Sequence, residues 1–395
     1  MKKKECISIE EKAYWHWFLS LPVSYVGQQK LLAFYGTPKK VMEAPEEQAA
    51  QIIGKESAGI EYLKISKNKD WKKAYMDMQE HGICLTLKEE EEYPEALQPL
   101  ADAPYGLYHI GKLPEDEPCV GIIGARSCSR YGQEMAMEIA GMLAEAGIGI
   151  VSGMARGIDG AGQWSALEHG GKSYAVLGSG VDVCYPADNE RLYHRLKING
   201  TIISEFPPGA EPLPWHFPVR NRIISGLSRV LVVVEARKKS GSLITADFAL
   251  EQGRDIYAVP GRITDALSAG CNELIRSGAG IVTSPEMLLE ELGVSCIKKE
   301  NNSKKSVIRL AKKENMLYSG LDLKPKSTEV IRSETGLPVA EIMEILVSLQ
   351  LKGLVREEGT GCYALTGRNV LTIRGDVEHG KESGNCGITG KGKNN

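Results

Sequence analysis

Five short segments of this 395-residue chain bring together glycine, hydroxyl side chains and basic residues, which are groups that bind phosphate. The first segment, GARSCSRYG, spans residues 124–132 and follows the apolar run 120–123. A glycine at the end of a strand lets backbone N–H groups approach an anion, and the N-terminus of the following helix adds a favourable dipole. With further donors from Arg126 and Ser129, the segment predicts a phosphate-binding loop; a tight turn with solvated arginines is the alternative interpretation.

Two more segments follow strands of the same pattern. SGMARGID, residues 152–159, lies between an apolar run and a helical pattern, so it should reach the same carboxyl edge of the sheet, where open α/β sheets bind ligands. VLGSGVDVCYPADN, residues 176–189, begins like a dinucleotide-binding fingerprint but has Val183 where the third glycine is required. The chain is therefore expected to use no cofactor of that kind.

The last two segments are the most basic. FPVRNRIIS, residues 217–225, opens a stretch in which residues 220–239 include six basic side chains and one acidic one. An aromatic ring beside Arg-Asn-Arg suits stacking on bases and pairing with phosphates, whereas internal ion pairs at a helix start are the alternative. KKSGSLIT, residues 238–245, repeats the helix-start pattern. The predicted nucleic-acid site comprises Gly124, Arg126, Ser127, Ser129, Gly153, Arg156, Phe217, Arg220, Asn221, Arg222, Lys238, Lys239, Ser240, Gly241 and Ser242.

The elements that must position these segments alternate between short apolar strands and amphipathic helices from about residue 82 onward. Such alternation predicts an α/β fold, with a Rossmann-like, doubly wound and mostly parallel sheet. A helical pattern precedes it, and a helix-turn-helix pattern with a short β-hairpin follows it. The predicted domains are a helical domain of the SAM or helix-hairpin-helix type at 1–70, the Rossmann-like domain at 71–296, a linker at 297–318, a winged-helix domain at 319–367 and a disordered tail at 368–395.

Composition limits the classes of function that remain. The formal net charge is −3, so contact with nucleic acid requires a local basic patch rather than bulk charge. The nine cysteines form no CxxC pair and the seven histidines are scattered, which predicts reduced thiols and no metal site. The N-terminus lacks the apolar core of a signal peptide, and no apolar run approaches 18 residues. A cytoplasmic protein without membrane contact is expected.

Taken in order, the segments GARSCSRYG, SGMARGID, GSGVDVCYPADN, SEFPPGAEPLPWHFPVRNRIISGLS, VVEARKKSGSLITADFALEQGRDIYAVPG and CNELIRSGA resemble the signature of the DNA-processing protein A (DprA/Smf) family. The resemblance covers about residues 82–290. It implies a single-stranded DNA-binding protein, not an enzyme, that loads the recombinase RecA in natural transformation and forms a homodimer through its core. It also places Arg126 in the family's Gly-Ser-Arg loop, the 217–222 segment in its FPxRNR motif and Ser240 in its SGS motif. Two departures are Ala125 in place of serine and Gly162-Gln163 in place of Ala-His.

Two other functions are compatible with parts of the sequence. A nucleotide-processing enzyme of the Lonely-guy type shares the fold class, but its PGGxGTxxE motif is replaced by SGSLITADFALE. A regulator that binds duplex DNA through the winged helix would need a basic recognition helix, yet residues 339–351 include two glutamates and no lysine or arginine. We therefore expect that helix to contact protein, and we expect Arg126 and Arg222 to converge on one DNA strand. Candidate acids for the enzyme are Asp159, Asp182, Glu205 and Glu235.

Overall fold

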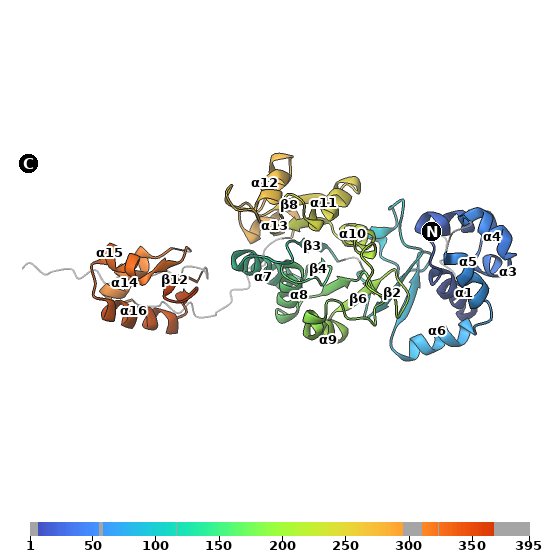
Figure 1. Cartoon of the computed structure of the whole chain (residues 1–395), viewed down its shortest axis with the longest axis horizontal. Helices are drawn as coiled ribbons and strands as arrows, with labels where there is room; N and C mark the ends of the chain where they lie inside the picture. Colours follow the sequence, from blue (N-terminus) through green and yellow to red (C-terminus); the bar gives the residue numbers. More distant parts are fainter. Residues whose placement is uncertain (1–6, 55–57, 116, 295–309, 323, 367–395) are drawn as a thin grey trace, which may run out of the picture. The chain divides into compact units, whose positions relative to one another are not determined.

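The structure is a computed structural model that describes residues 7–54, 58–115, 117–294, 310–322 and 324–366 (Figure 1). The chain divides into two compact units, Met1–Ile297 and Lys298–Asn395. The first unit contains all five segments that the sequence singles out for phosphate binding, so it is the unit that positions the candidate site.

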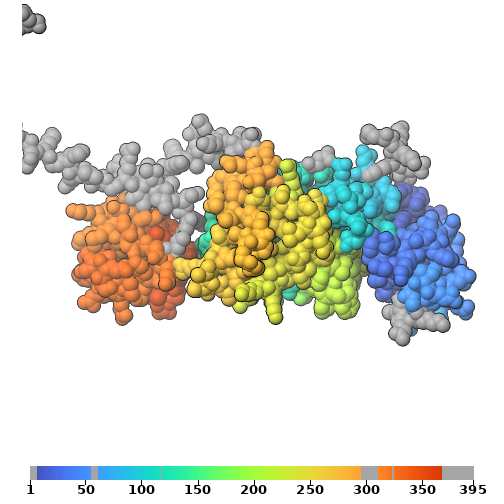
Figure 2. All heavy atoms as spheres, turned by 90° about the horizontal axis from the view of Figure 1, so that it is seen from above, coloured from blue at the N-terminus to red at the C-terminus, as the bar shows by residue number. Residues whose placement is uncertain are grey.

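The N-terminal part of the first unit is helical, as the sequence predicts. Several helices begin at a residue whose side chain accepts a backbone N–H bond, among them Ser8, Ser24, Thr37 and Asp70. The helices share one hydrophobic core with the nearest strands, because Trp17 and its neighbours pack into the same cluster as sheet residues. On the surface, the N-terminal part lies directly against the segment that follows it (Figure 2). The elements are α1 (Ile9–Leu19), α2 (Tyr25–Tyr35), α3 (Pro38–Glu43), α4 (Glu46–Ile53), α5 (Ala58–Ser66) and α6 (Trp71–Glu80).

A nine-stranded sheet forms the centre of the unit, in the order β1-β2-β6-β5-β4-β3-β7-β8-β9. The pairs β1–β2 and β2–β6 are antiparallel and the others are parallel, which confirms the predicted doubly wound, mostly parallel sheet. The direction of winding reverses between β3 and β7, the position where such sheets bind ligands. The strands are β1 (Cys84–Leu87), β2 (Gly106–Ile110), β3 (Cys119–Ile123), β4 (Gly149–Ser152), β5 (Ser173–Val176), β6 (Thr201–Ser204), β7 (Val230–Val233), β8 (Asp255–Ala258) and β9 (Gly280–Ile281).

Helices cover both faces of this sheet (Figure 1). Alternate strand residues such as Ile122 and Ile123 enter opposite clusters: α7, α8 and α13 pack on one face, and α10, α11 and α12 on the other. The helices are α7 (Arg130–Glu145), α8 (Ile158–Glu168), α9 (Glu190–Asn199), α10 (His216–Leu227), α11 (Gly241–Glu251), α12 (Ala269–Arg276) and α13 (Pro285–Glu291), with 3-10 turns η1 (Glu95–Leu97) and η2 (Ala187–Asn189).

The second unit has its own core around Leu317, Ile342 and Leu346. Its sheet has the order β10-β12-β11, and α14 begins at Lys312, inside the segment that the sequence predicts as a linker. The element order fits a winged helix, which stays a prediction; the predicted tail lies outside the described residues. The elements are α14 (Lys312–Gly320), β10 (Lys326–Ser327), α15 (Thr328–Thr335), α16 (Val339–Leu351), β11 (Val355–Glu357) and β12 (Cys362–Leu365).

Three further features of the described residues bear on function. Within the described ranges, no helix is long and apolar enough to cross a membrane. No group of three or more histidine, cysteine or acidic side chains is placed to hold a metal ion there either. The six cysteines that lie within the described residues are all free thiols.

Candidate nucleic-acid interface

A cleft of about 660 Å³ opens at the carboxyl edge of the strands, at the switch between β3 and β7. It is lined by residues from the loops after β3, β4, β5, β6 and β7, from the first turns of α8 and α11, and from one face of α10. The structure brings ten of the fifteen predicted residues to this cleft: Gly124, Arg126, Ser127, Phe217, Arg220, Asn221, Lys239, Ser240, Gly241 and Ser242. The other five, Ser129, Gly153, Arg156, Arg222 and Lys238, lie outside its lining.

The loop after β3 is shaped by Ser129 and Glu235. Ser129 caps α7 by accepting the N–H of Gly132 at 3.0 Å, and its backbone N–H donates to the buried carboxylate of Glu235 at 2.8 Å. The Ser129 hydroxyl donates to the same carboxylate. Ser129 therefore holds the loop, while Arg126 and Ser127, which precede it, are exposed toward the cleft.

The loop after β4 is fixed by the buried carboxylate of Asp159. Its two oxygens accept the backbone N–H groups of Gly124 at 3.3 Å and Gly153 at 3.2 Å, so it joins this loop to the loop after β3. Burial raises the pKa of Asp159, and the nearby charge of Arg220 opposes that rise. Arg156, the cation that the sequence predicts in this loop, is exposed and forms an ion pair with Asp188.

Helix α10 carries the FPVRNR segment, so this basic stretch lies on a helix. Phe217, Arg220, Asn221 and Ile224 line the cleft, and their i, i+3, i+4, i+7 spacing places them on one helix face. Arg220 is 5% exposed and donates from Nη1 to the carbonyl oxygens of Gly153, at 2.8 Å, and Val176. Burial lowers the pKa of Arg220 to about 10, so it remains a cation at neutral pH beneath the cleft surface.

Aromatic rings form the second chemical element of the cleft. The rings of Phe217 and Tyr185 lie 5.4 Å apart, and the guanidinium of Arg126 lies 5.6 Å from the Phe217 ring centroid. Tyr185 is 40% exposed; Trp215, one residue before α10 and outside the cleft lining, is 63% exposed. An arginine over an aromatic ring beside an exposed second ring is an arrangement on which a nucleobase can stack.

The loop after β7 supplies the remaining donors. Ser240 caps α11 by accepting the N–H of Ser242, and their hydroxyls lie 2.7 Å apart. Arg237 and Lys239 are exposed and line the cleft, whereas Lys238 does not. Across the described ranges, neither these two cations nor Arg126 has a carboxylate within ion-pair distance, so three charges remain available to an anionic ligand.

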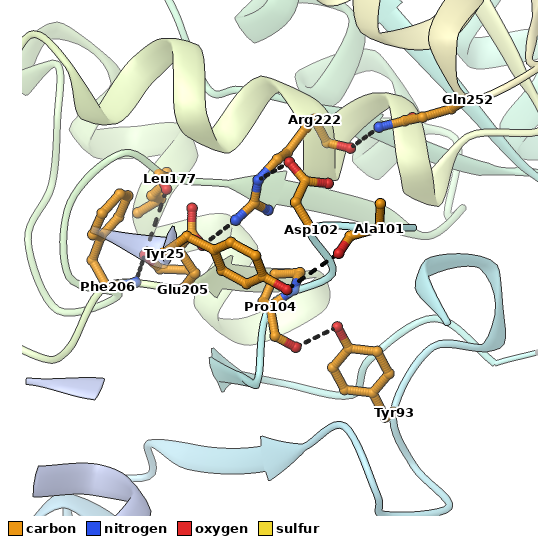
Figure 3. Close-up of polar contacts among 11 residues, drawn as sticks. Tyr25, Tyr93, Ala101, Asp102, Pro104, Leu177, Glu205, Phe206, Arg222 and Gln252 are labelled. Carbon is orange, nitrogen blue, oxygen red and sulfur yellow. Dashed lines mark hydrogen bonds and ion pairs between the residues drawn. The ribbon is translucent and has the colours of Figure 1, made fainter. Parts of the chain in front are cut away.

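The expected convergence of Arg126 and Arg222 on one strand is wrong in this structure. Arg222 is 3% exposed and faces away from the cleft, where Asp102 and Glu205 hold its guanidinium (Figure 3). At 100° per residue it lies about 150° around the helix from the face that Phe217 and Arg220 occupy. The alternative that the sequence left open, internal ion pairs at an arginine-rich helix start, describes Arg222 correctly.

The four acids named for the enzyme alternative each hold local structure. Asp159 and Glu235 join loops at the cleft through backbone N–H groups. Asp182 accepts the backbone N–H of Gly209 at 2.8 Å, and Glu205 pairs with Arg222 at 2.6 Å. Because each carboxylate already has a partner, none of them is placed here as an unengaged general acid or base.

Sequence reasoning missed two residues of the lining that matter. Arg237 belongs to the basic stretch 220–239 together with Lys238 and Lys239. Counting charges does not show which of these three cations face the cleft. Tyr185 lies inside the segment 176–189, which is set aside because its dinucleotide fingerprint is incomplete. Its one available signal was an aromatic residue in a loop directly after a strand.

Comparison with known proteins adds an independent finding. The profile of a family described as DNA recombination-mediator protein A matches residues 84–293. The chain is 46% identical over 200 residues to DNA processing protein DprA of Streptococcus pneumoniae, covering 50% of this chain and 71% of the relative. It is 38% identical over 276 residues to Protein Smf of Escherichia coli, covering 68% and 73%. The X-ray structure of the Streptococcus pneumoniae protein superimposes with a TM-score of 0.60 at 35% identity, covering 73% of this chain and 99% of that chain.

Proposed function

Because this chain belongs to the family of DNA recombination-mediator protein A, the DprA/Smf proteins, we propose that it binds single-stranded DNA in the cleft at the β3–β7 switch. The observation that carries the proposal is the convergence of Arg126, Arg237 and Lys239, three cations without an ion-pair partner among the described residues, with the Phe217–Tyr185 ring pair in one cleft. Cations that follow a backbone, next to rings that stack on bases, are the combination that single-strand binding proteins use.

The arrangement favours a single strand over a duplex. Base stacking on Phe217 or Tyr185 requires a base whose face is accessible, and the bases of a duplex are stacked on each other. Backbone N–H groups and arginines contact phosphates, which carry no sequence information. Binding is therefore tolerant of sequence and weakened by salt, because each neutralised phosphate releases counterions.

The proposed role is binding and delivery rather than catalysis. A recombination mediator presents its bound strand to a recombinase. We propose that this recombinase is RecA and that the protein acts as a homodimer. The support for this step is membership of the family whose description names recombination mediation. The cleft needs no cofactor for it, because phosphate and base contacts are made by the chain's own side chains.

A gel-shift competition tests the proposal. A labelled 20-nucleotide single strand is bound by the full chain and competed with unlabelled single strand or with the matching duplex, at two salt concentrations. We expect the single strand to compete better than the duplex and binding to weaken at the higher salt concentration. Preference for one duplex sequence, or binding unaffected by salt, would contradict the proposal.

A further inference from the structure

The buried arginine on the far side of α10 is held by two carboxylates (Figure 3). Arg222 Nε forms an ion pair with Asp102 Oδ2 at 3.1 Å, and its Nη2 donates to Glu205 at 2.6 Å. The Arg222 side chain is 4% exposed. Asp102 lies in the segment before β2, and Glu205 directly follows β6. The guanidinium therefore connects α10 to the two neighbouring strands β2 and β6 of the sheet.

The same guanidinium also contacts the N-terminal helices. Its Cζ lies 5.9 Å from the ring of Tyr25, the first residue of α2. Tyr25 stacks on Tyr105 with ring centroids 5.4 Å apart, and its hydroxyl donates to the carbonyl of Ala101 at 3.3 Å. Arg222 thus joins three parts of the unit at one point: α10, the segment before β2 and the start of α2.

The backbone of Arg222 extends this junction to α11. Its carbonyl oxygen accepts the side-chain amide of Gln252 at 3.0 Å, and Gln252 caps the C-terminal end of α11. Helices α10 and α11 each carry cleft residues near their N-terminal ends, Phe217 on the first and Ser242 on the second. Since a helix is stiff and rises 1.5 Å per residue, a shift at Arg222 moves Phe217, about 7.5 Å away along the axis.

Stability alone does not account for this charge cluster. Two buried atoms, Arg222 Nη1 and Glu205 Oε1, have no hydrogen-bond partner among the described residues. Buried ion pairs are often no more stabilising than apolar packing of the same volume, and incomplete pairing lowers their contribution further. A planar guanidinium between two carboxylates does, however, fix one relative orientation, because its donors point in set directions.

We propose that Arg222 is a positioning residue for the DNA cleft. By holding Asp102, Glu205 and Tyr25 it sets the orientation of α10, so that Phe217 and Arg220 are presented to the bound strand. This inference rests on the proposed function of the cleft. It assigns to Arg222 an effect on DNA affinity without any contact to DNA.

The test uses the full chain and compares single-strand affinity, by fluorescence anisotropy, in matched variants. Arg222→Lys keeps the charge and loses the planar fork. Asp102→Asn removes the charge of the partner that is 46% exposed and leaves the buried pair with Glu205 in place, so it keeps the test open should Arg222→Lys fail to fold. We expect Arg222→Lys and Asp102→Asn each to weaken affinity about threefold to tenfold. The slope of log affinity against log salt should stay at the parent value, because no phosphate contact is lost.

Double-mutant cycles separate positioning from a general loss of folded protein. When Arg222→Lys is combined with Phe217→Ala, the fold-loss in single-strand affinity should be smaller than the product of the two single losses, because Arg222 acts through α10. Combined with Lys239→Ala, which lies in the loop after β7, it should lose the full product. Three results would each overturn the inference. The first is unchanged DNA affinity in both Arg222→Lys and Asp102→Asn, and the second is that the affinity losses multiply in both double-mutant cycles. The third is a salt slope reduced by about 0.7 in Arg222→Lys. Arg126→Ala, measured alongside, tests the cleft itself, so the proposed function and the role of Arg222 fail separately.

Discussion

Replacing Gly153 with alanine should destabilise the first unit through Arg220. An added Cβ would overlap Arg220 Nη2 and lie 2.5 Å from its Cζ, which is closer than a side chain tolerates. The guanidinium must move, and it then loses hydrogen bonds to the carbonyls of Gly153 and Val176. Hydrogen bonds from a charged group contribute about 1.5–3 kcal/mol each, so with partial compensation the free energy of unfolding should fall by about 3 kcal/mol.

The assay is urea unfolding of the parent chain and the Gly153→Ala variant, followed by circular dichroism. Gly241→Ala is the matched control, because no atom lies within 4 Å of its added Cβ and the residue occupies the first turn of α11. The control should change stability by less than about 0.5 kcal/mol. If Gly153→Ala costs no more than Gly241→Ala, Arg220 is not held by these two carbonyls, and its place beneath the cleft is refuted.

Three further predictions concern the cleft and the second unit. Phe217→Ala should weaken single-strand binding by about 1–3 kcal/mol with an unchanged salt slope, since it removes stacking and no charge; anisotropy titrations at several salt concentrations check this. A chain ending at residue 300 should keep single-strand affinity within about tenfold, 1.4 kcal/mol, because the cleft lies wholly in the first unit; abolished binding with a folded, dimeric core would show that the second unit contacts DNA. Glu314 is partly buried, yet bonds from Lys352 and Ser348 lower its pKa to about 2, below its unfolded value of 4.5. Its stabilising contribution is therefore complete above pH 4.5 and lost as the pH falls toward 2, and Glu314→Gln should remove that dependence in hydrogen exchange of α14 and α16.

The cleft could be predicted from the sequence because its loops follow parallel strands. Segments that end successive strands of a doubly wound sheet must meet at one edge, so Arg126, Phe217 and Ser240 converge once the strands are identified. The spacing of residues 217, 220, 221 and 224 is also that of one face of a helix. On a helix with that face toward the cleft, Arg222 necessarily lies on the opposite side.

What the sequence could not reveal is which polar residues are already engaged. Ser129 and Arg222 are chemically suited to phosphate, but Glu235 and Glu205 occupy them from positions 106 and 17 residues away in the chain. Such partners are set by tertiary packing and leave no local pattern. For the same reason, the shared core of the N-terminal helices and the sheet follows from contacts such as His16 with Tyr108, 92 residues apart.

The central proposal is that one strand of DNA lies in the cleft and is held there by Arg126, Arg237 and Lys239. The most direct measurement is the slope of log affinity against log salt for a labelled single strand, in the parent chain and in Arg126→Ala, Arg237→Ala and Lys239→Ala. Each phosphate contact that is lost should reduce the slope by about 0.7, with circular dichroism unchanged. Parent slopes and parent affinities in all three folded variants would contradict the proposal and place the DNA elsewhere on the protein.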